Sequence, residues 1–382
     1  MTKIQKDNKN VAKFPNLRFP EFTEEWNREK IVSILTIGSG KDYKHLSKGT
    51  IPVFGTGGYM ASVDDFLYEG ESVCIGRKGT INKPLYFNGK FWTVDTLFYT
   101  HSFKNVLPKF VYNIFEQINW LKYNEASGVP SLSKSTIEQI DINIPCVEEQ
   151  QKIATFLSLI DERIQTQNKI IGQLETLIKG LSENLFSQKI RFKKFEKKWE
   201  VKTLGEILIE INERTINSNQ YRVLSSTAKG LFYQSDYFNK EVASKDSAGY
   251  KILKFNQLVF SPQNLWLGNI NVNTTYEIGI VSPSYKVFSF NEKAIVSYCK
   301  YFLKSSKMMF EYEQCSEQGA SIVRRNLNMD LFLNIPILLP KLEEQIQISS
   351  FLTKIDQKIQ TEKAILEQLE IQKKYLLQQM FV

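Results

Sequence analysis

Residues 145–187 read PCVEEQQKIATFLSLIDERIQTQNKIIGQLETLIKGLSENLFS, and residues 340–382 read PKLEEQIQISSFLTKIDQKIQTEKAILEQLEIQKKYLLQQMFV. At a shift of 195 positions, 19 of the 43 residues are identical. Shared amino-acid bias does not produce a likeness of that size, so these two stretches are copies of an internal repeat.

Both copies have the period of a helix. In the first, apolar residues recur at spacings of three, four or seven: Ile153, Leu157, Ile160, Ile164, Ile171, Leu174, Ile178, Leu181 and Leu185. The second has the same rhythm at Ile348, Leu352, Ile355, Ile359, Leu366, Leu369, Leu376 and Met380. A hydrophobic period near 3.5 residues is typical of a coiled-coil seam. About 40 helical residues extend roughly 60 Å.

So narrow an apolar seam needs a partner helix, and the nearest candidate is the other copy. If the first helix runs from one globular part to the next, the second must run back, which predicts an antiparallel pair with an approximate two-fold axis. The alternative is that each helix packs only on its own domain. Gln167, Glu362 and Lys373 occupy seam-like positions, where they could set the register or meet helices of another protein.

A weaker repeat opens each globular part. Arg18-Phe19, Phe22 and Trp26 recur as Arg191-Phe192, Phe195 and Trp199. We therefore expect mixed α/β (α+β) domains joined by two long helices. The expected boundaries are an N-terminal tail at 1–17, a first domain at 18–146, a central helix at 147–190, a second domain at 191–339 and a last helix at 340–382.

Local signals add detail to both domains. Asn88-Gly89 lies between the apolar runs of 84–94 and predicts a β-hairpin. Other expected elements are a helix over 108–123, a capping box at Ser135 and Glu138, a strand ending at Ile144 and a helical stretch at 292–309.

Composition indicates a globular chain. Its 382 residues suggest two or three domains, with 42% hydrophobic and 24% charged residues and a net charge of +8. The two helical copies are close to neutral, so the basic excess lies in the domains and in 189–198. A net charge of this size permits a polyanion partner without requiring one. We find no apolar run long enough to span a membrane and no secretory leader. The four cysteines form no C-x-x-C pair, which favours buried thiols in a reducing, cytoplasmic location.

Little in the chain supports catalysis. Only His45 and His101 are available for a histidine-based site. The loop of an amino-methyltransferase requires two adjacent prolines, and the sequence has no such pair. Asp42-Tyr43-Lys44 and Asp356-Gln357-Lys358 resemble half of a nuclease motif, but such tripeptides are common. We expect the chain not to be an enzyme by itself.

Taken together, the duplicated P-x-x-E-E-Q at 145–150 and 340–345 and the long helices resemble the specificity subunit of type I restriction–modification systems. CIGRKGTINKP (74–84) with FWTVDTLFYT (91–100) is similar to one kind of target-recognition domain. LVFSPQNLWLGNI (258–270) with GIVSPSY (279–285) is similar to another kind.

The resemblance implies a non-catalytic DNA reader. Each domain would read one half of a split, asymmetric site in double-stranded DNA, with the helix pair as a ruler for the unread gap. Two methyltransferase subunits and the restriction subunits are expected to assemble on it. They would use S-adenosylmethionine, ATP and Mg²⁺, with no cofactor on this chain and no membrane partner.

The candidate DNA-binding residues lie in polar or basic loops. Those of the first domain are Tyr59, Arg77, Lys78, Thr80, Lys83, Ser131 and Lys134; those of the second are Gln263, Asn264, Trp266, Ser321, Arg324, Arg325 and Asn326. Aligned by eye, 263–266 replaces the Arg77 turn, and 324–326 replaces 133–135.

Alternatives stay open for the arginines. Arg77 could lie in a plain solvated turn, while Arg324 and Arg325 could be a surface pair or could pair with helix glutamates. For the whole chain, the rival interpretations are a stand-alone nuclease or methyltransferase and a coiled-coil adaptor with protein partners only.

Overall fold

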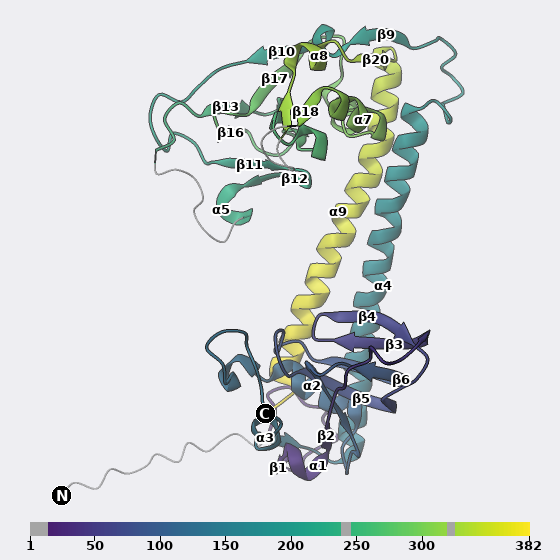
Figure 1. Ribbon diagram of the computed structural model, residues 1–382, viewed down its shortest axis with the longest axis vertical. Coiled ribbons are helices and arrows are strands. Elements are labelled where there is room, and N and C mark those ends of the chain that lie inside the picture. Colours follow the sequence, from purple (N-terminus) through teal and green to yellow (C-terminus); the bar gives the residue numbers. More distant parts are fainter. Residues whose placement is uncertain (1–13, 238–245, 319–324) are drawn as a thin grey trace, which may run out of the picture. The chain divides into compact units, whose positions relative to one another are not determined.

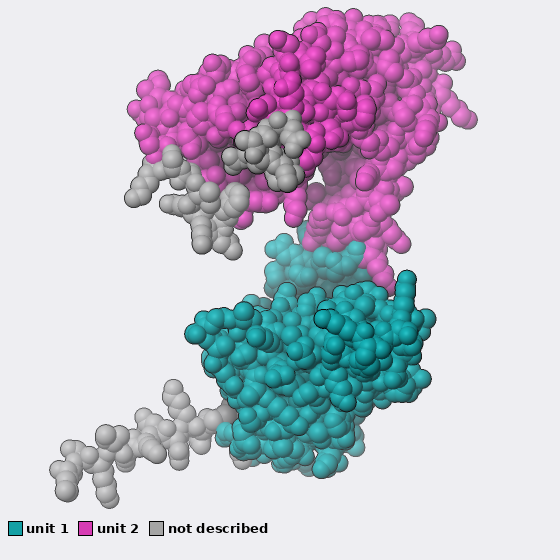
Figure 2. Space-filling model, viewed as in Figure 1, with its two compact units in different colours: residues 1–168, 364–382 teal, residues 169–363 magenta. Residues whose placement is uncertain are grey.

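The computed structural model describes residues 14–237, 246–318 and 325–382. The chain divides into two compact units, one of residues 1–168 with 364–382 and one of residues 169–363 (Figure 2). Each unit holds one globular part together with one end of each long helix.

The long helices are α4 (Val147–Phe186) and α9 (Leu342–Gln379) (Figure 1). In the first unit, Lys373 of α9 pairs with Asp161 of α4 at 2.7 Å. In the second unit, Lys363 of α9 pairs with Glu175 of α4 at 2.6 Å. Early residues of α4 thus meet late residues of α9 and the reverse, which confirms the antiparallel pairing. The alternative that each helix packs on its own domain alone is wrong.

The first unit is built on a six-stranded sheet. Its strand order is β2 (Thr36–Ser39), β7 (Leu97–His101), β5 (Tyr68–Gly76), β6 (Leu85–Thr93), β3 (Lys48–Gly55) and β4 (Gly58–Val63). All neighbours are antiparallel except β3 and β6. A separate ribbon joins β1 (Asn27–Lys30) to β8 (Asp141–Ile144), and the short helices are α1 (Ile31–Ile34), α2 (Pro108–Gln117) and α3 (Lys134–Glu138).

The predicted hairpin at Asn88-Gly89 is wrong. These two residues lie inside β6, opposite Glu71 and Gly70 of β5. Gly89 and Gly70 have φ angles of +109° and +136°, so the strands bend together at a place where only glycine adopts that backbone cheaply. Because β5 offers a partner along nearly the whole of β6, the chain reverses before Leu85 instead.

Other local expectations need correction. The 108–123 helix ends at Gln117, and a separate 3-10 turn follows at Trp120–Tyr123. The cap of α3 is Ser133, whose Oγ accepts the Thr136 N–H at 3.1 Å, and not Ser135. The strand ending at Ile144 is confirmed as β8.

The second unit has a smaller sheet and four ribbons. The sheet order is β10 (Leu208–Ile211), β17 (Lys286–Phe290), β14 (Leu258–Phe260) and β15 (Ile270–Val272). The ribbons pair β9 (Glu200–Thr203) with β20 (Pro336–Leu339), β11 (Leu224–Thr227) with β12 (Gly230–Tyr233), β13 (Lys251–Lys254) with β16 (Ile278–Val281), and β18 (Ser316–Gln318) with β19 (Arg325–Leu327).

The short helices of the second unit, over its described residues, are α5 (Gln234–Tyr237), α6 (Val296–Phe302), α7 (Ser306–Gln314) and α8 (Met329–Leu333). The stretch 292–309, predicted to be helical, holds two helices, α6 and α7, and Ser305 caps α7. Mixed α/β units joined by two long helices confirm the predicted fold class.

Each unit buries one end of the helix pair in its main core. In the first, Ile153 and Leu157 of α4 and Leu376 of α9 share a cluster with Trp26 and Phe110. In the second, a cluster around Tyr298, Phe302 and Phe332 takes up Phe186 of α4 and Leu352 of α9. In the part of the chain that is described, no helix is long and apolar enough to span a bilayer.

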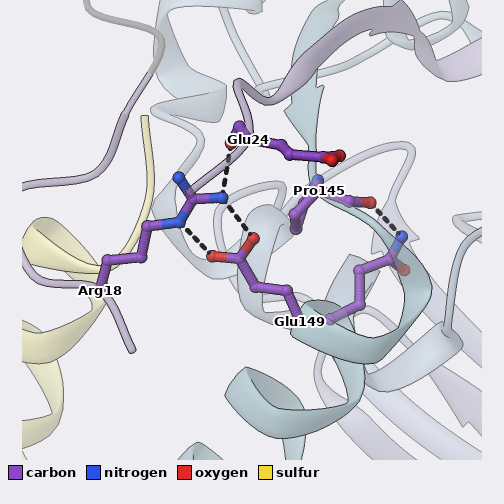
Figure 3. Close-up of polar contacts among 5 residues, drawn as sticks. Arg18, Glu24, Pro145 and Glu149 are labelled. Carbon is purple, nitrogen blue, oxygen red and sulfur yellow. Dashed lines mark hydrogen bonds and ion pairs between the residues drawn. The ribbon is translucent and has the colours of Figure 1, made fainter. Parts of the chain in front are cut away.

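The duplicated motifs meet at the base of each long helix. The guanidinium of Arg18 donates two hydrogen bonds of 2.7 Å to the Glu149 carboxylate and a third, of 2.6 Å, to the Glu24 carbonyl (Figure 3). Arg191 binds Glu344 in the same bidentate way, at 2.8 Å. The arginine of the weak repeat and the glutamate of the strong repeat are therefore two halves of one junction.

The glutamine of each P-x-x-E-E-Q motif completes the junction. Gln150 donates to the carbonyls of Asn105 and Pro145, and its Oε1 accepts the Leu107 N–H at the start of α2, at 2.9 Å. Gln345 binds the start of α6 in the same way, accepting the Ile295 N–H at 2.8 Å. Each long helix is thus fixed to its domain by buried side chains.

Candidate nucleic-acid interface

In the first unit the candidate site is the loop that leaves β5. The N–H of Arg77 donates to the Thr96 carbonyl at 2.8 Å, and the Arg77 carbonyl accepts the Leu132 N–H at 2.9 Å. The N–H of Gly79 donates to the Pro130 carbonyl at 2.8 Å. The loop is therefore held on both sides by backbone hydrogen bonds, which leaves its side chains free to face solvent.

Four of the predicted residues share one groove of about 670 Å³: Arg77, Lys78, Ser131 and Lys134. The guanidinium carbon of Arg77 lies 5.9 Å from the centre of the Phe98 ring. Its Nη1 also reaches the Asp95 carbonyl at 3.4 Å. Lys134 lies 3.7 Å from Glu138, one turn along α3, in an exposed pair that binds it weakly.

Sequence reasoning missed Asp95, Phe98 and Glu125, which line the same groove. Hydrogen bonds from the hydroxyls of Thr136 and Ser133 hold the pKa of Glu125 below its usual range, so this carboxylate stays charged beside the lysines. A signal for Asp95 and Phe98 was present, because both lie in the stretch 91–100 that carries the resemblance.

The other candidates of this unit lie around the loop. Tyr59 is 64% exposed on β4, and its hydroxyl lies 3.0 Å from Ser62 Oγ. Thr80 is half-buried, whereas Lys83 is exposed in the loop before β6. The described contacts do not bring Tyr59 or Lys83 against Arg77.

In the second unit, Gln263, Trp266 and Arg325 are brought together. The N–H of Arg325 donates to the Gln263 carbonyl at 3.1 Å. The Arg325 guanidinium carbon lies 4.1 Å from the centre of the Trp266 ring, and Nη2 lies 3.2 Å from Glu313 Oε1. Arg325 does pair with a glutamate, but that glutamate is on α7 and not on a long helix.

The remaining candidates of the second unit are less constrained. Asn264 has a buried Oδ1 that accepts no hydrogen bond from the described residues, and Asn326 is exposed on β19. Ser321 and Arg324 lie outside the described residues.

The two loops are structural counterparts. In the first unit the N–H of Leu132 donates to the carbonyl of Arg77, and in the second the N–H of Arg325 donates to the carbonyl of Gln263. The alignment of 324–326 with 133–135 is wrong, because Ser133 caps α3 as Asn328 caps α8.

The chemistry of both loops is that of polar recognition. Guanidinium groups placed over aromatic rings keep donors free for an acceptor in front of them. Among the described residues no group of three or more histidine, cysteine, aspartate or glutamate side chains is arranged to hold a metal ion.

Comparison with known proteins decides the family. Residues 23–176 and 196–371 match a family profile described as the type I restriction modification DNA specificity domain. The chain belongs to this family. The two matched ranges follow the internal repeat, so each half of the chain carries one copy of the specificity domain.

Specificity subunits of type I restriction enzymes from Methanocaldococcus jannaschii are similar to the chain. The MjaVIII subunit is 25% identical over 334 residues, covering 80% of this chain and 74% of the relative. The MjaIX subunit is 31% identical over 206 residues, covering 45% of this chain and 46% of the relative. The chain thus matches about half the length of the MjaIX subunit.

A solved structure shares the fold of the specificity-domain family. The S subunit of a type I restriction-modification system from M. genitalium aligns with a TM-score of 0.61 and 16% identity, covering 97% of this chain and 99% of that one. At this identity the match supports the fold, and the contacts of the site rest on the geometry above.

Proposed function

We propose that this chain is the DNA-reading subunit of a type I restriction–modification complex and reads a split, asymmetric site. The observation that carries the proposal is the pair of counterpart loops, each held by the same kind of backbone hydrogen bond and each with an arginine over an aromatic ring. In the first unit that arginine is Arg77 of the loop itself, and in the second it is Arg325 of β19, which lies over Trp266 of the loop. Because the side chains of the two loops differ, the two half-sites differ as well.

The reading chemistry follows from the side chains of each loop. Arginine and lysine pair with guanine in the major groove, and asparagine and glutamine pair with adenine. The loop with Arg77 and Lys78 is suited to guanine or to phosphates, whereas the loop with Gln263 is suited to adenine. The first half-site is therefore expected to contain guanine and the second adenine.

The antiparallel α4–α9 pair acts as the ruler for the unread gap. Buried junctions fix each long helix to its domain, so the length of the pair sets the spacing of the half-sites along the DNA. Readers of double-stranded DNA bind equivalent faces about one helical turn apart, roughly 34 Å.

The chain is proposed to be non-catalytic and to bind no cofactor itself. Two methyltransferase subunits and the restriction subunits assemble on it and supply the chemistry with S-adenosylmethionine, ATP and Mg²⁺. The chain's own part is to place the bound DNA before these subunits.

The experiment is to express the chain with its methyltransferase partner in a cell without other modification and to map every methylated site. The proposal predicts one sequence made of two unlike half-sites with a constant gap. A palindromic site, or methylation without the chain, contradicts it.

A second measurement separates the proposal from a protein adaptor and from a stand-alone enzyme. The affinity of the chain for duplex DNA is measured against salt concentration. A DNA reader shows a steep linear fall of log affinity with log salt, because phosphate contacts release counterions, whereas an adaptor shows none. A stand-alone enzyme modifies DNA when purified without partners.

A further inference from the structure

A second basic groove lies in the second unit, apart from the Gln263 loop. It has a volume of about 920 Å³ and opens between α4, the β11–β12 turn, α6, the start of α7 and α9. Ile178, Phe232 and Met309 contribute apolar wall, and four lysines and two carboxylates contribute the charge: Lys179, Lys229, Lys300, Lys304, Glu183 and Asp356.

Both carboxylates of this groove are already engaged. Glu183 Oε1 accepts hydrogen bonds of 2.8 Å from the N–H and the hydroxyl of Ser306 at the start of α7. Asp356 Oδ2 accepts from Lys300 Nζ at 2.8 Å and from the Tyr301 hydroxyl at 3.2 Å. Glu183 therefore stabilises the wall at the start of α7, and Asp356 neutralises Lys300.

Three lysines of the groove have no acidic partner among the residues that the structure describes. Lys304 Nζ donates to the neutral Asn271 Oδ1 at 2.7 Å, and within the described residues Lys179 and Lys229 form no ion pair. Burial of its charged end, together with the neighbouring Lys300, lowers the pKa of Lys304 to about 8. An anion in the groove relieves that cost by pairing with the lysine.

The first unit provides an internal comparison. Leu107 and Ile295 are counterparts, because each donates its N–H to the glutamine of its junction. Glu116 on α2 lies nine residues after Leu107, and Lys304 lies nine residues after Ile295, so these two residues are counterparts as well. Glu116 pairs at 2.7 Å with Lys373, a lysine only 12% exposed that also binds Asp161. The first unit thus neutralises this position with its own side chains.

The second unit has the opposite arrangement. At the shift of the helical repeat, Lys373 is replaced by Ile178 on α4, while Asp161 is retained as Asp356. Lys304 stands where the first unit has Glu116, and Glu183, the second acid of the groove, binds Ser306 instead of a lysine. The positive charge at Lys304 therefore belongs to the second unit alone, whereas Lys179 is matched by Lys374 in the first.

We propose that the groove of Lys179, Lys229 and Lys304 binds phosphate groups, and that these are backbone phosphates of duplex DNA outside the half-site. The source of the phosphates rests on the proposed function, whereas the phosphate chemistry rests on the lysines. Because phosphates repeat along every duplex, the groove raises affinity equally for all sequences and adds no specificity.

The test uses the full chain with Lys179→Gln, Lys229→Gln and Lys304→Gln combined. Each phosphate contact contributes about 0.9 to the slope of log affinity against log salt, so the slope is expected to fall in magnitude by about 2–3 with the preferred sequence unchanged. The control combines Lys293→Gln, Lys341→Gln and Lys354→Gln, which removes the same charge from exposed positions that do not line the groove.

A readout without DNA is the melting temperature in the presence of pyrophosphate. Pyrophosphate should stabilise the parent chain and the control but not the groove variant, and arginine in place of the three glutamines should restore both readouts. A salt slope in the groove variant equal to that of the control overturns the proposal, even if pyrophosphate binds. If the parent chain shows no sequence preference at all, the proposed function fails, and the pyrophosphate shift still decides whether the groove binds phosphate.

Discussion

Arg77 is the side chain of the first unit that we propose to contact a base. It projects from a loop fixed at both edges by backbone hydrogen bonds, so little reorganisation is needed when it binds. We predict that Arg77→Ala weakens binding by about 1–3 kcal/mol for duplexes with the correct first half-site. Duplexes altered in that half-site should lose little, and preference for the second half-site should stay unchanged. An equal loss on every sequence would instead identify a phosphate contact.

Glu149 shows what the duplicated glutamate does at the scale of one residue. Its carboxylate is buried, and Arg18 is its bidentate partner. Glu149→Ala leaves Arg18 without that partner, so the free energy of unfolding should fall by about 3–5 kcal/mol, as for a broken buried pair.

Asp141→Ala is the matched control for the Glu149 variant, because it removes the carboxylate of an exposed pair with Arg28 in the same unit. That change should lower the free energy of unfolding by at most about 1 kcal/mol. Chemical denaturation measures both, and equal effects of the two variants would show that the Arg18–Glu149 pair contributes no more than a surface pair.

Some residue roles were open to prediction and others were not. Arg77 was identifiable because a basic turn after a strand is a local pattern. The partners of Glu149 were not, since Arg18 lies 131 residues away and only the fold brings the two together. The same holds for Trp266, whose stacking on Arg325 depends on two distant segments.

At the scale of elements, Lys373 fixes α9 to the first unit. Its Nζ lies 2.7 Å from both Glu116 of α2 and Asp161 of α4, and the side chain is largely buried. Lys373→Met leaves two nearby carboxylates without a cation, so we predict a loss of about 3–5 kcal/mol in the free energy of unfolding.

Lys363→Met provides the comparison for Lys373, because it removes a second α9 lysine that pairs with α4, through Glu175, in an exposed position. Its effect should be at most about 1 kcal/mol. The difference between the two variants is measured by denaturant midpoints, and a similar small effect of both would contradict the role given to Lys373.

Elements set by local sequence were predicted better than elements set by distant pairing. The long helices follow from an uninterrupted period over about ten turns, which no strand tolerates. Asn88-Gly89 misled because its preference for a turn is weaker than the pairing of β6 with β5. Likewise, the break after α6 depends on the cap at Ser305, a single residue inside a helix-like run.

At the scale of the whole chain, duplication and divergence have separate consequences. The junctions at Glu149 and Glu344 are nearly identical, which keeps the attachment of each helix to its domain the same. The loops at Arg77 and Gln263 have diverged, and so has the charge at Glu116 and Lys304. The two copies of the repeat therefore differ in the side chains of their loops, whereas the attachment of the long helix to the domain is the same in both.

The measurement that tests the ruler most directly is the gap length in a chain with longer helices. Seven residues are inserted after Thr166 of α4 and seven more after Leu369 of α9, which line one shallow groove of the helix pair. The insertions lengthen each helix by two turns, about 10 Å. That length corresponds to about 3 base pairs of DNA. Mapping of methylated sites should then show the same two half-sites with a gap wider by about 3 base pairs. Unchanged spacing in this lengthened protein would contradict the account.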